Sequence, residues 1–280
     1  MQIKSCLLHL HLQFASKFTN FINTKNMDLK NKTILITGGS AGIGLEAAKQ
    51  FFEIGAKVII TGRSQEKLDA AKKLYPNLIA IKSDVANEED AISLFNQVKE
   101  LGGIDILYNN AGVGVMPSNL GVASDKHFEG ATYEMNINYL AVIRLNNLFL
   151  DMLKSRKESA IINTTSVLSY VPSMLEATYS ATKTALAFYT KSLREHLRIA
   201  NSPVKVFELL PPAVETELIA HRKVKKMSTE KLIKGLIAGL QNDQYTIRIG
   251  YTTAIYMLNR LFPKLAFRLV NPREADKFLQ

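Results

Sequence analysis

Residues 33–55 read TILITGGSAGIGLEAAKQFFEIG, and this stretch decides the fold. It opens with an apolar, β-branched run over 33–37, which predicts a buried strand. Glycines follow, and residues 45–54 then carry apolar side chains at helical spacing. A strand, a glycine loop and a helix in this order are typical of dinucleotide binding, because missing Cβ atoms admit a pyrophosphate and the helix N-terminus supplies N–H donors.

The loop supplies the first candidate cofactor contacts. A glycine pattern alone is a weak signal, but its position between a strand and a helix favours the cofactor interpretation. The loop residues that we predict to contact a dinucleotide are Gly38, Ser40, Ala41, Gly42, Ile43 and Gly44.

The second predicted strand, 57–61, decides which dinucleotide is favoured. An acid just after it would bond the 2′-hydroxyl of an NAD ribose, but residues 57–65 contain none. Arg63 stands there instead, and a guanidinium suits a ribose 2′-phosphate, with Ser40 as a further donor. We therefore predict NADP(H), with NAD(H) as the less favoured cofactor. The plain alternative is that Arg63 is an exposed loop residue.

Strand and helix patterns alternate along the rest of the chain. The predicted strands are 78–82, 104–108, 160–163 and 204–210, and the predicted helices are 88–101, 131–154 and 177–200. This alternation predicts an α/β fold, a Rossmann-type doubly wound parallel sheet in three αβα layers. Its ligand crevice should lie at the carboxyl ends of the strands.

Further candidate cofactor residues follow these strands directly. Asp84 could meet the adenine, or it could cap the next helix, and Asn110 and Gly112 could bind the cofactor or shape a turn. The candidates at strand ends are Asp84, Val85, Asn110, Ala111, Gly112, Pro212, Val214 and Thr216.

Residues 160–183, AIINTTSVLSYVPSMLEATYSATK, point to the chemistry. Tyr179 and Lys183 are four residues apart on a predicted helix and share a face. A fixed cation stabilises a phenolate and lowers a phenol pKa from about 10 toward neutrality. Ser166 could hold a substrate oxygen against that phenol, which predicts proton transfer on a carbonyl or an alcohol. Taken alone, such a pair is more often a solvated helix face.

One buried amide remains open to two interpretations. Asn138 lies among apolar residues of the predicted helix 131–154. It is either a satisfied hydrogen bond of the core or an element of the active site.

Charge and composition exclude several classes. Of the net charge of +10, residues 1–26 contribute three Lys and no acid, and residues 221–280 contribute 12 basic and 4 acidic side chains. No nucleic-acid motif accompanies this excess, so we predict no nucleic-acid partner. Cys6 alone excludes an internal disulfide, the five His form no ligand pattern, and we predict no metal and a cytoplasmic location.

The two ends differ from the centre of the chain. Residues 1–26 lack a secretory cleavage pattern, and Met27 begins MDLKNKTILITGG. We predict a disordered or misassigned N-terminal extension over 1–26, with a weak targeting or interfacial helix as the alternative. Residues 27–280 then form one domain, in which 218–280 is a substrate lid.

The segment 245–270 mixes apolar residues with Arg260, Lys264 and Arg268. It either packs on the domain with a solvated basic face or forms the rim of a site for a lipid-like or anionic substrate. In the second case it could touch a membrane peripherally. The irregular stretch 113–130 could add a lip to that site.

Taken together, the motifs resemble the classical short-chain dehydrogenase/reductase (SDR) family over residues 30–217. They are TGxxxGxG at 37–44, NNAG at 109–112, Ser166 thirteen residues before Tyr179, YxxxK at 179–183, and a stretch at 212–216 that is similar to PGxxxT but one residue shorter. Ala213 replaces the glycine of the last motif, which leaves the local loop geometry in doubt. More narrowly, residues 38–46 and 210–218 are similar to the DltE-type branch.

The resemblance implies roles for four residues. Tyr179 would transfer the proton, Lys183 would lower its pKa and bind the nicotinamide ribose, and Ser166 would polarise the carbonyl. Asn138 would support a water relay to Lys183. Tyr179 and Lys183 thus also belong to the implied cofactor contacts. A homo-oligomer, dimer or tetramer, would form through the helices near 131–154 and 177–200.

The sequence therefore predicts an NADP(H)-dependent oxidoreductase acting on a small-molecule carbonyl or alcohol. The alternatives are a non-catalytic NADP(H)-sensing regulator and a membrane-peripheral binding protein on the same fold.

Overall fold

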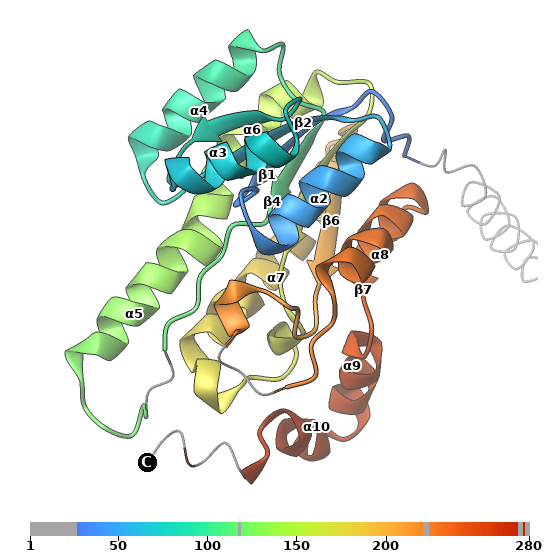
Figure 1. Ribbon diagram of the computed structural model, residues 1–280. Helices are drawn as coiled ribbons and strands as arrows, with labels where there is room; N and C mark the ends of the chain where they lie inside the picture. The colour runs from blue at the N-terminus through green and yellow to red at the C-terminus, as the bar shows by residue number, and fades with distance from the viewer. Residues whose placement is uncertain (1–26, 117–118, 221–223, 274–276, 278–280) are drawn as a thin grey trace, which may run out of the picture.

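Seven short runs of mostly apolar residues form one parallel sheet in the computed structural model, which describes residues 27–116, 119–220, 224–273 and 277 (Figure 1). The strand order is β3-β2-β1-β4-β5-β6-β7, so the direction of winding reverses between β1 and β4. Ligands of such sheets bind outside the carboxyl ends of the strands at that reversal. The strands are β1 (Thr33–Thr37), β2 (Lys57–Gly62), β3 (Ile79–Lys82), β4 (Ile106–Asn109), β5 (Ser159–Thr164), β6 (Val204–Leu210) and β7 (Thr246–Arg248).

Helices cover both faces of the sheet and create two apolar cores. On one face α2, α3 and α8 bury residues such as Phe51, Leu68 and Leu236 against β1, β2 and β6. On the other face α4, α6 and α7 bury Leu94, Phe149 and others. The predicted three-layer doubly wound fold is confirmed. The helices are α2 (Gly42–Glu53), α3 (Gln65–Leu74), α4 (Glu88–Glu100), α5 (Asp125–Met135), α6 (Ala141–Lys154), α7 (Ala177–Ile199), α8 (Thr229–Gln241), α9 (Thr252–Leu261) and α10 (Pro263–Val270).

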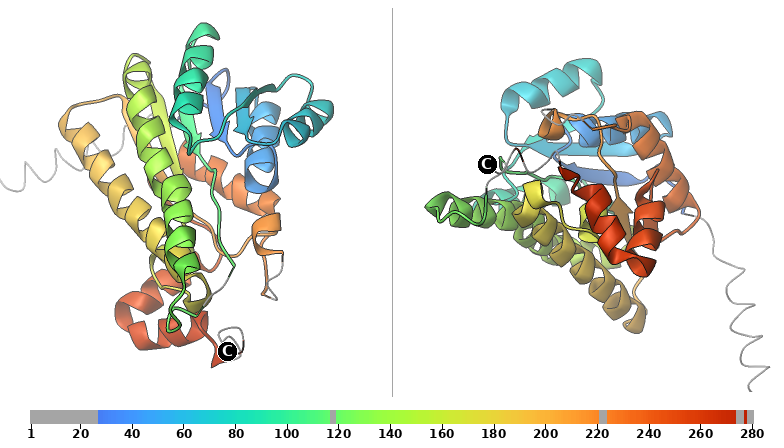
Figure 2. Two further views of the ribbon diagram at one scale, coloured as in Figure 1. Left: turned by 90° about the vertical axis from the view of Figure 1, so that its left-hand side faces the viewer. Right: turned by 90° about the horizontal axis from the view of Figure 1, so that it is seen from below.

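One turn of π-helix, Asn136–Leu140, joins α5 to α6 in a continuous rod. This rod lies beside α7, as the left view of Figure 2 shows. A π turn within an α-helix is rare and is often found at functional sites. Asn138 lies in this turn, so the turn sets the direction of the amide predicted to serve the site.

Two elements differ from the sequence prediction. The long helix begins at Asp125 instead of 131, so only the first part of the stretch 113–130 is irregular. Gly130 and sparse apolar residues concealed this first turn, and Val115 packs against the space that a side chain at 130 would fill. The strand β7 was not predicted, because its three residues are too short for a period-2 pattern to show.

Two helices, α9 and α10, follow β7 at the carboxyl side of the sheet. In Figure 1, α9 and α10 lie together at the lower end of the molecule, away from α3 and α4 at the top. This position brings the C-terminal helices next to the turn that links β5 to α7.

Candidate functional site

The glycine loop between β1 and α2 has a backbone conformation that residues with a Cβ atom rarely adopt. Gly38 and Gly42 have positive φ angles of 64° and 54°. A methyl group at Gly44 would overlap the carbonyl oxygen of Gly38, so the helix start lies directly on the loop. Ala41 occupies the N-cap and offers no side-chain acceptor, which leaves the N-terminal N–H groups of α2 directed at the crevice. This arrangement suits an anionic group.

Asn110, after β4, holds this loop in shape. Its side-chain amide donates to the carbonyl oxygens of Thr37 at 3.0 Å and Gly38 at 3.3 Å. In return, the Thr37 hydroxyl accepts from the backbone N–H groups of Asn110 and Ala111. Asn110 therefore ties the end of β4 to the end of β1, and it also lines the crevice.

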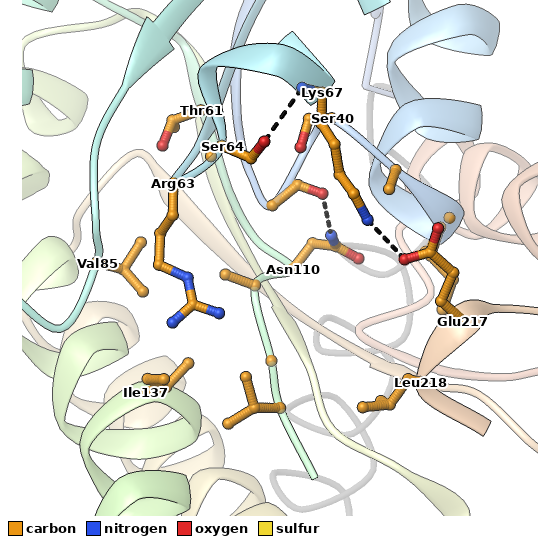
Figure 3. A pocket seen from close by; sticks show the side chains of 18 of the residues that line it. Ser40, Thr61, Arg63, Ser64, Lys67, Val85, Asn110, Ile137, Glu217 and Leu218 are labelled. Carbon is orange, nitrogen blue, oxygen red and sulfur yellow. Dashed lines mark hydrogen bonds and ion pairs between the residues drawn. The ribbon is translucent and has the colours of Figure 1, made fainter. Parts of the chain in front are cut away.

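A cavity of about 600 Å³ opens at the loop. In Figure 3 the Arg63 side chain extends into this cavity toward Ile137. Its Nη1 donates to the hydroxyl of Tyr133 on α5 at 3.1 Å, a contact that the sequence did not indicate. The predicted cofactor residues that line this cavity are Gly38, Ser40, Ala41, Gly42, Ile43, Arg63, Asp84, Val85, Asn110, Ala111, Gly112 and Thr216.

Lys67 and Glu217 form an ion pair across the same cavity, with 2.6 Å between Nζ and Oε2 (Figure 3). Lys67 belongs to α3 and Glu217 follows β6, so the pair joins two walls that are 150 residues apart in sequence. Both side chains are well exposed, and their attraction is therefore weak. The sequence did not indicate this pair, because no local pattern relates the two positions.

Asp84 is not the helix cap that the sequence also allowed, because another residue caps α4. Asn87 is the N-cap of α4, and its side chain accepts from the N–H of Asp90. Asp84 instead accepts from the N–H of Ala86 in a local turn, at the wall of the cavity.

A second cavity, of about 630 Å³, contains the predicted catalytic groups Ser166, Tyr179 and Lys183. It shares lining residues with the first cavity, so the two form parts of one crevice. The shared residues are Ile43, Asn110, Gly112, Thr216, Glu217 and Leu218. Pro212 and Val214, which were predicted as cofactor contacts, line the second cavity.

Lys183 is a buried cation at the floor of this cavity. Its Nζ donates to the carbonyl oxygen of Thr164 at 2.9 Å and lies 5.6 Å from the centre of the Tyr179 ring. Burial lowers the pKa of Lys183 to about 8. Ser166, on the turn after β5, is also buried, and its hydroxyl accepts from the N–H of Leu168.

Asn138 has the satisfied core hydrogen bonds that were one of its two predicted roles, and its role in the active site stays a prediction. Its side chain exchanges two 2.9 Å hydrogen bonds with the backbone of Val113 and donates to the hydroxyl of Thr182 at 3.1 Å. Asn138 is fully buried and does not line the second cavity. A methyl group at Gly112 would lie 3.3 Å from Asn138 Oδ1 and 3.4 Å from Lys183 Nζ, so both polar atoms border this glycine.

The turn between Ser166 and Tyr179 is held by the C-terminal helices. Asn259 of α9 donates to the carbonyl oxygen of Tyr170, and Asn271, just after α10, donates to that of Pro172, both at 2.9 Å. Asn271 also accepts from the N–H of Met174 at 2.7 Å. These asparagines were not identified from the sequence, because a single Asn in an amphipathic segment has no distinctive pattern.

The rim of the second cavity is apolar and exposed. Five lining side chains belong to the large apolar or aromatic residues that remain open to solvent: Met116, Leu218, Val224, Tyr251 and Leu269. They come from the irregular stretch after β4 and from the segment after β6. The substrate lip and lid expected from these two segments stay predictions.

Among the residues that the structure describes, no group of three or more His, Cys, Asp or Glu side chains could hold a metal ion. Within the same residues, no helix is long and apolar enough to span a bilayer. The predicted N-terminal extension, 1–26, and residues 221–223 of the basic C-terminal segment lie outside the described residues.

The chain is similar to several known proteins. The family model described as short chain dehydrogenase matches residues 32–226. The uncharacterized oxidoreductase DltE of Bacillus subtilis is 35% identical over 228 residues, which cover 79% of this chain and 89% of that protein. The NADPH-dependent 1-acyldihydroxyacetone phosphate reductase of Schizosaccharomyces pombe is 33% identical over 190 residues, which cover 67% of this chain and 61% of that protein.

A solved structure shares most of this fold. A short chain dehydrogenase from Burkholderia cenocepacia in complex with NADP aligns with a TM-score of 0.77 at 26% identity. The alignment covers 87% of this chain and 99% of that chain.

Proposed function

The chain belongs to the short-chain dehydrogenase/reductase family, and we propose that it is an NADP(H)-dependent oxidoreductase that interconverts a carbonyl and an alcohol. The observation that carries the proposal is the position of Ser166, Tyr179 and Lys183 in one cavity that continues into the glycine-loop cavity. A nicotinamide cofactor would supply the hydride in that crevice. Binding, orientation and proton transfer would come from the side chains of this chain.

The residues at the first cavity suit NADP(H). The left-handed Gly38 and Gly42 and the α2 N-terminus leave room and N–H donors for a pyrophosphate. Arg63 extends into the cavity beyond β2, where a guanidinium could pair with a 2′-phosphate. Support also comes from the Burkholderia relative in complex with NADP and from the NADPH-dependent yeast relative.

In the proposed reaction Tyr179 exchanges a proton with the substrate oxygen, and the Ser166 hydroxyl holds that oxygen in place. Lys183 carries a positive charge beside the phenol, and this charge favours the phenolate form when the proton leaves. An ammonium has three N–H donors, and Thr164 takes one of them. The other two are available to the cofactor ribose or to water. Asn138 acts as a positioning residue through Val113 and Thr182.

Two surfaces support our proposals for the substrate class and for the assembly. The apolar rim of the second cavity favours a substrate with a lipid-like portion. We also propose a homo-oligomer through the rod of α5 and α6 and the adjacent α7, where Leu140 and Phe188 are exposed. A cytoplasmic location is consistent with the single cysteine.

A cofactor-consumption screen tests this function. The purified protein, incubated with NADPH, should consume it only when an aldehyde or ketone is added, and medium-chain and cyclic carbonyls should react faster than short ones. NADPH binding without consumption across the panel and across the matching alcohols with NADP would instead favour a cofactor-sensing regulator. Absence of NADPH binding by fluorescence would contradict both interpretations.

A further inference from the structure

The helices α9 and α10 expose an unusual amount of apolar surface. In α10 only Ala266 is buried, and Leu261, Phe262 and Leu269 are 65%, 61% and 61% exposed. We call the exposed part of these helices the α9–α10 surface. Its large apolar members are Met257, Leu261, Phe262, Leu265, Phe267 and Leu269. Large apolar side chains exposed together on two neighbouring helices mark an interaction site more often than a surface left to water.

The charges on the same surface have one sign. Residues 244–273 contain five Lys or Arg and no Asp or Glu. Arg260, Lys264 and Arg268 are exposed among the apolar side chains. A second copy of this surface would bring like charges together, whereas an anionic partner would satisfy them. Basic side chains with apolar neighbours are typical of helices that lie in a lipid–water interface.

The α9–α10 surface is continuous with the mouth of the catalytic cavity. Leu269 belongs to both, and Tyr251, just before α9, also lines the cavity rim. Seen from below in Figure 2, right, α9 and α10 face the viewer at the end of the molecule where the strands have their carboxyl ends. A flat partner on this surface would therefore lie next to the entrance.

We propose that the α9–α10 surface docks on an anionic lipid bilayer and holds the mouth of the catalytic cavity against it. The apolar side chains enter the interface, and Arg260, Lys264 and Arg268 contact lipid phosphates. A carbonyl compound dissolved in the bilayer could then reach Tyr179 without crossing bulk water. Only this last step depends on the proposed oxidoreductase function, and docking itself does not.

Vesicle flotation tests the charge contribution. The full chain should float with vesicles of phosphatidylcholine and phosphatidylglycerol, should not float with phosphatidylcholine alone, and should be released as salt rises. The double variant Lys264→Glu/Arg268→Glu should lose about tenfold or more of its binding. The matched control is Lys72→Glu/Lys73→Glu on α3, which changes the net charge equally on exposed residues elsewhere and should bind like the parent protein.

The apolar contribution has its own pair of variants. Leu261→Ser/Leu265→Ser should weaken binding to anionic vesicles, and Leu101→Ser/Ile199→Ser, equally exposed on other elements, should not. Thermal melting verifies that each variant folds. No flotation of the parent protein, or equal loss in both charge variants, would overturn the proposal. So would a Leu261→Ser/Leu265→Ser variant that still floats but forms a smaller oligomer, because the surface would then belong to a second copy.

Discussion

Lys183, which we propose to act in catalysis, should lower the stability of the fold. Its ammonium is buried, and burial lowers its pKa from the ordinary 10.5 to about 8. Below pH 8 the folded protein therefore carries a buried charge that the unfolded chain exposes to water. Between pH 8 and 10.5 the unfolded state binds more protons than the folded state, so this residue's contribution to stability rises with pH over that window.

Replacing the cation should make the protein more stable and inactive. We expect Lys183→Met to raise the free energy of unfolding at pH 7. Removing the buried charge contributes at most about 3 kcal/mol, and losing the hydrogen bond to Thr164 subtracts about 1 kcal/mol from that gain. Urea denaturation at pH 7 and pH 10 measures this effect. The difference between the two proteins should shrink at pH 10. A variant less stable than the parent protein at both pH values would show that the ammonium stabilises the fold.

At the same scale, Arg63 is the residue that we propose to set the cofactor preference. We expect Arg63→Gln to reduce kcat/KM for NADPH by about ten- to a hundredfold and to leave kcat/KM for NADH nearly unchanged, because only NADPH offers a 2′-phosphate. Steady-state kinetics with both cofactors checks this ratio. Lys67→Gln, which removes the neighbouring cation, is the control for a general loss of positive charge. An equal loss with both cofactors would assign Arg63 a structural role through Tyr133.

Local spacing made some site residues predictable and left others hidden. Ser166, Tyr179 and Lys183 could be identified because a helix repeat and a strand end place them, and the structure brings all three to one cavity. The contacts of Arg63 with Tyr133 and of Lys67 with Glu217 join residues 70 and 150 positions apart. Such pairs depend on the packing of whole elements, which residue spacing does not encode.

At the scale of elements, the turn between β5 and α7 depends on distant helices. Asn259 and Asn271 satisfy the carbonyl groups of Tyr170 and Pro172, and Arg248 of β7 donates to the Tyr170 hydroxyl at 2.9 Å. The Arg248 guanidinium also lies 4.2 Å from the centre of the Tyr256 ring. The C-terminal helices therefore fix the part of the chain that carries Ser166 toward Tyr179.

Replacing one of these asparagines, which are not reacting groups themselves, should reduce the rate of catalysis. Asn271→Ala leaves a backbone N–H and a backbone carbonyl without their side-chain partner, which should cost about 1–3 kcal/mol of stability. We expect kcat/KM to fall about ten- to a hundredfold through misplacement of the turn. The control is Asn242→Ala, which removes a local bond at the end of α8. Unchanged kinetics in Asn271→Ala would mean that the turn holds its shape unaided.

The strongly periodic elements were predictable, and the weakly patterned ones were not. The strand 204–210 matches its predicted position, since its apolar run marks it clearly. The strand β7 and the first turns of α5 were missed because pairing with β6 and packing of Val115 on Gly130, not local propensity, determine them.

At the scale of the whole molecule, the described domain begins at a buried residue. Met27 and Leu29 are each 1% exposed and belong to the core beside α2. The predicted domain boundary at Met27 has not been tested. The alternation of strands and helices sufficed to predict the layered sheet, whereas the packing of α9 and α10 against the turn after β5 depends on tertiary contacts that no motif indicates.

A truncated chain tests that boundary. A protein that starts at Met27 should unfold at the same temperature as the full chain, because the core residues of the first segment are retained. It should also keep the same kcat/KM with NADPH. Thermal melting and steady-state kinetics of the two chains measure both quantities. A marked loss of stability would show that residues 1–26 contribute to the fold.

The most direct test of the account is the rate of NADPH-dependent carbonyl reduction by Tyr179→Phe beside Tyr189→Phe. Both changes remove one hydroxyl from α7, but Tyr179 lines the catalytic cavity and Tyr189 contacts Asn146. We expect Tyr179→Phe to bind NADPH, to melt like the parent protein and to lose at least about a hundredfold in kcat, while Tyr189→Phe keeps its activity. Retention of kcat in Tyr179→Phe, with folding and NADPH binding intact, would contradict the assignment of this phenol as the proton-transfer group.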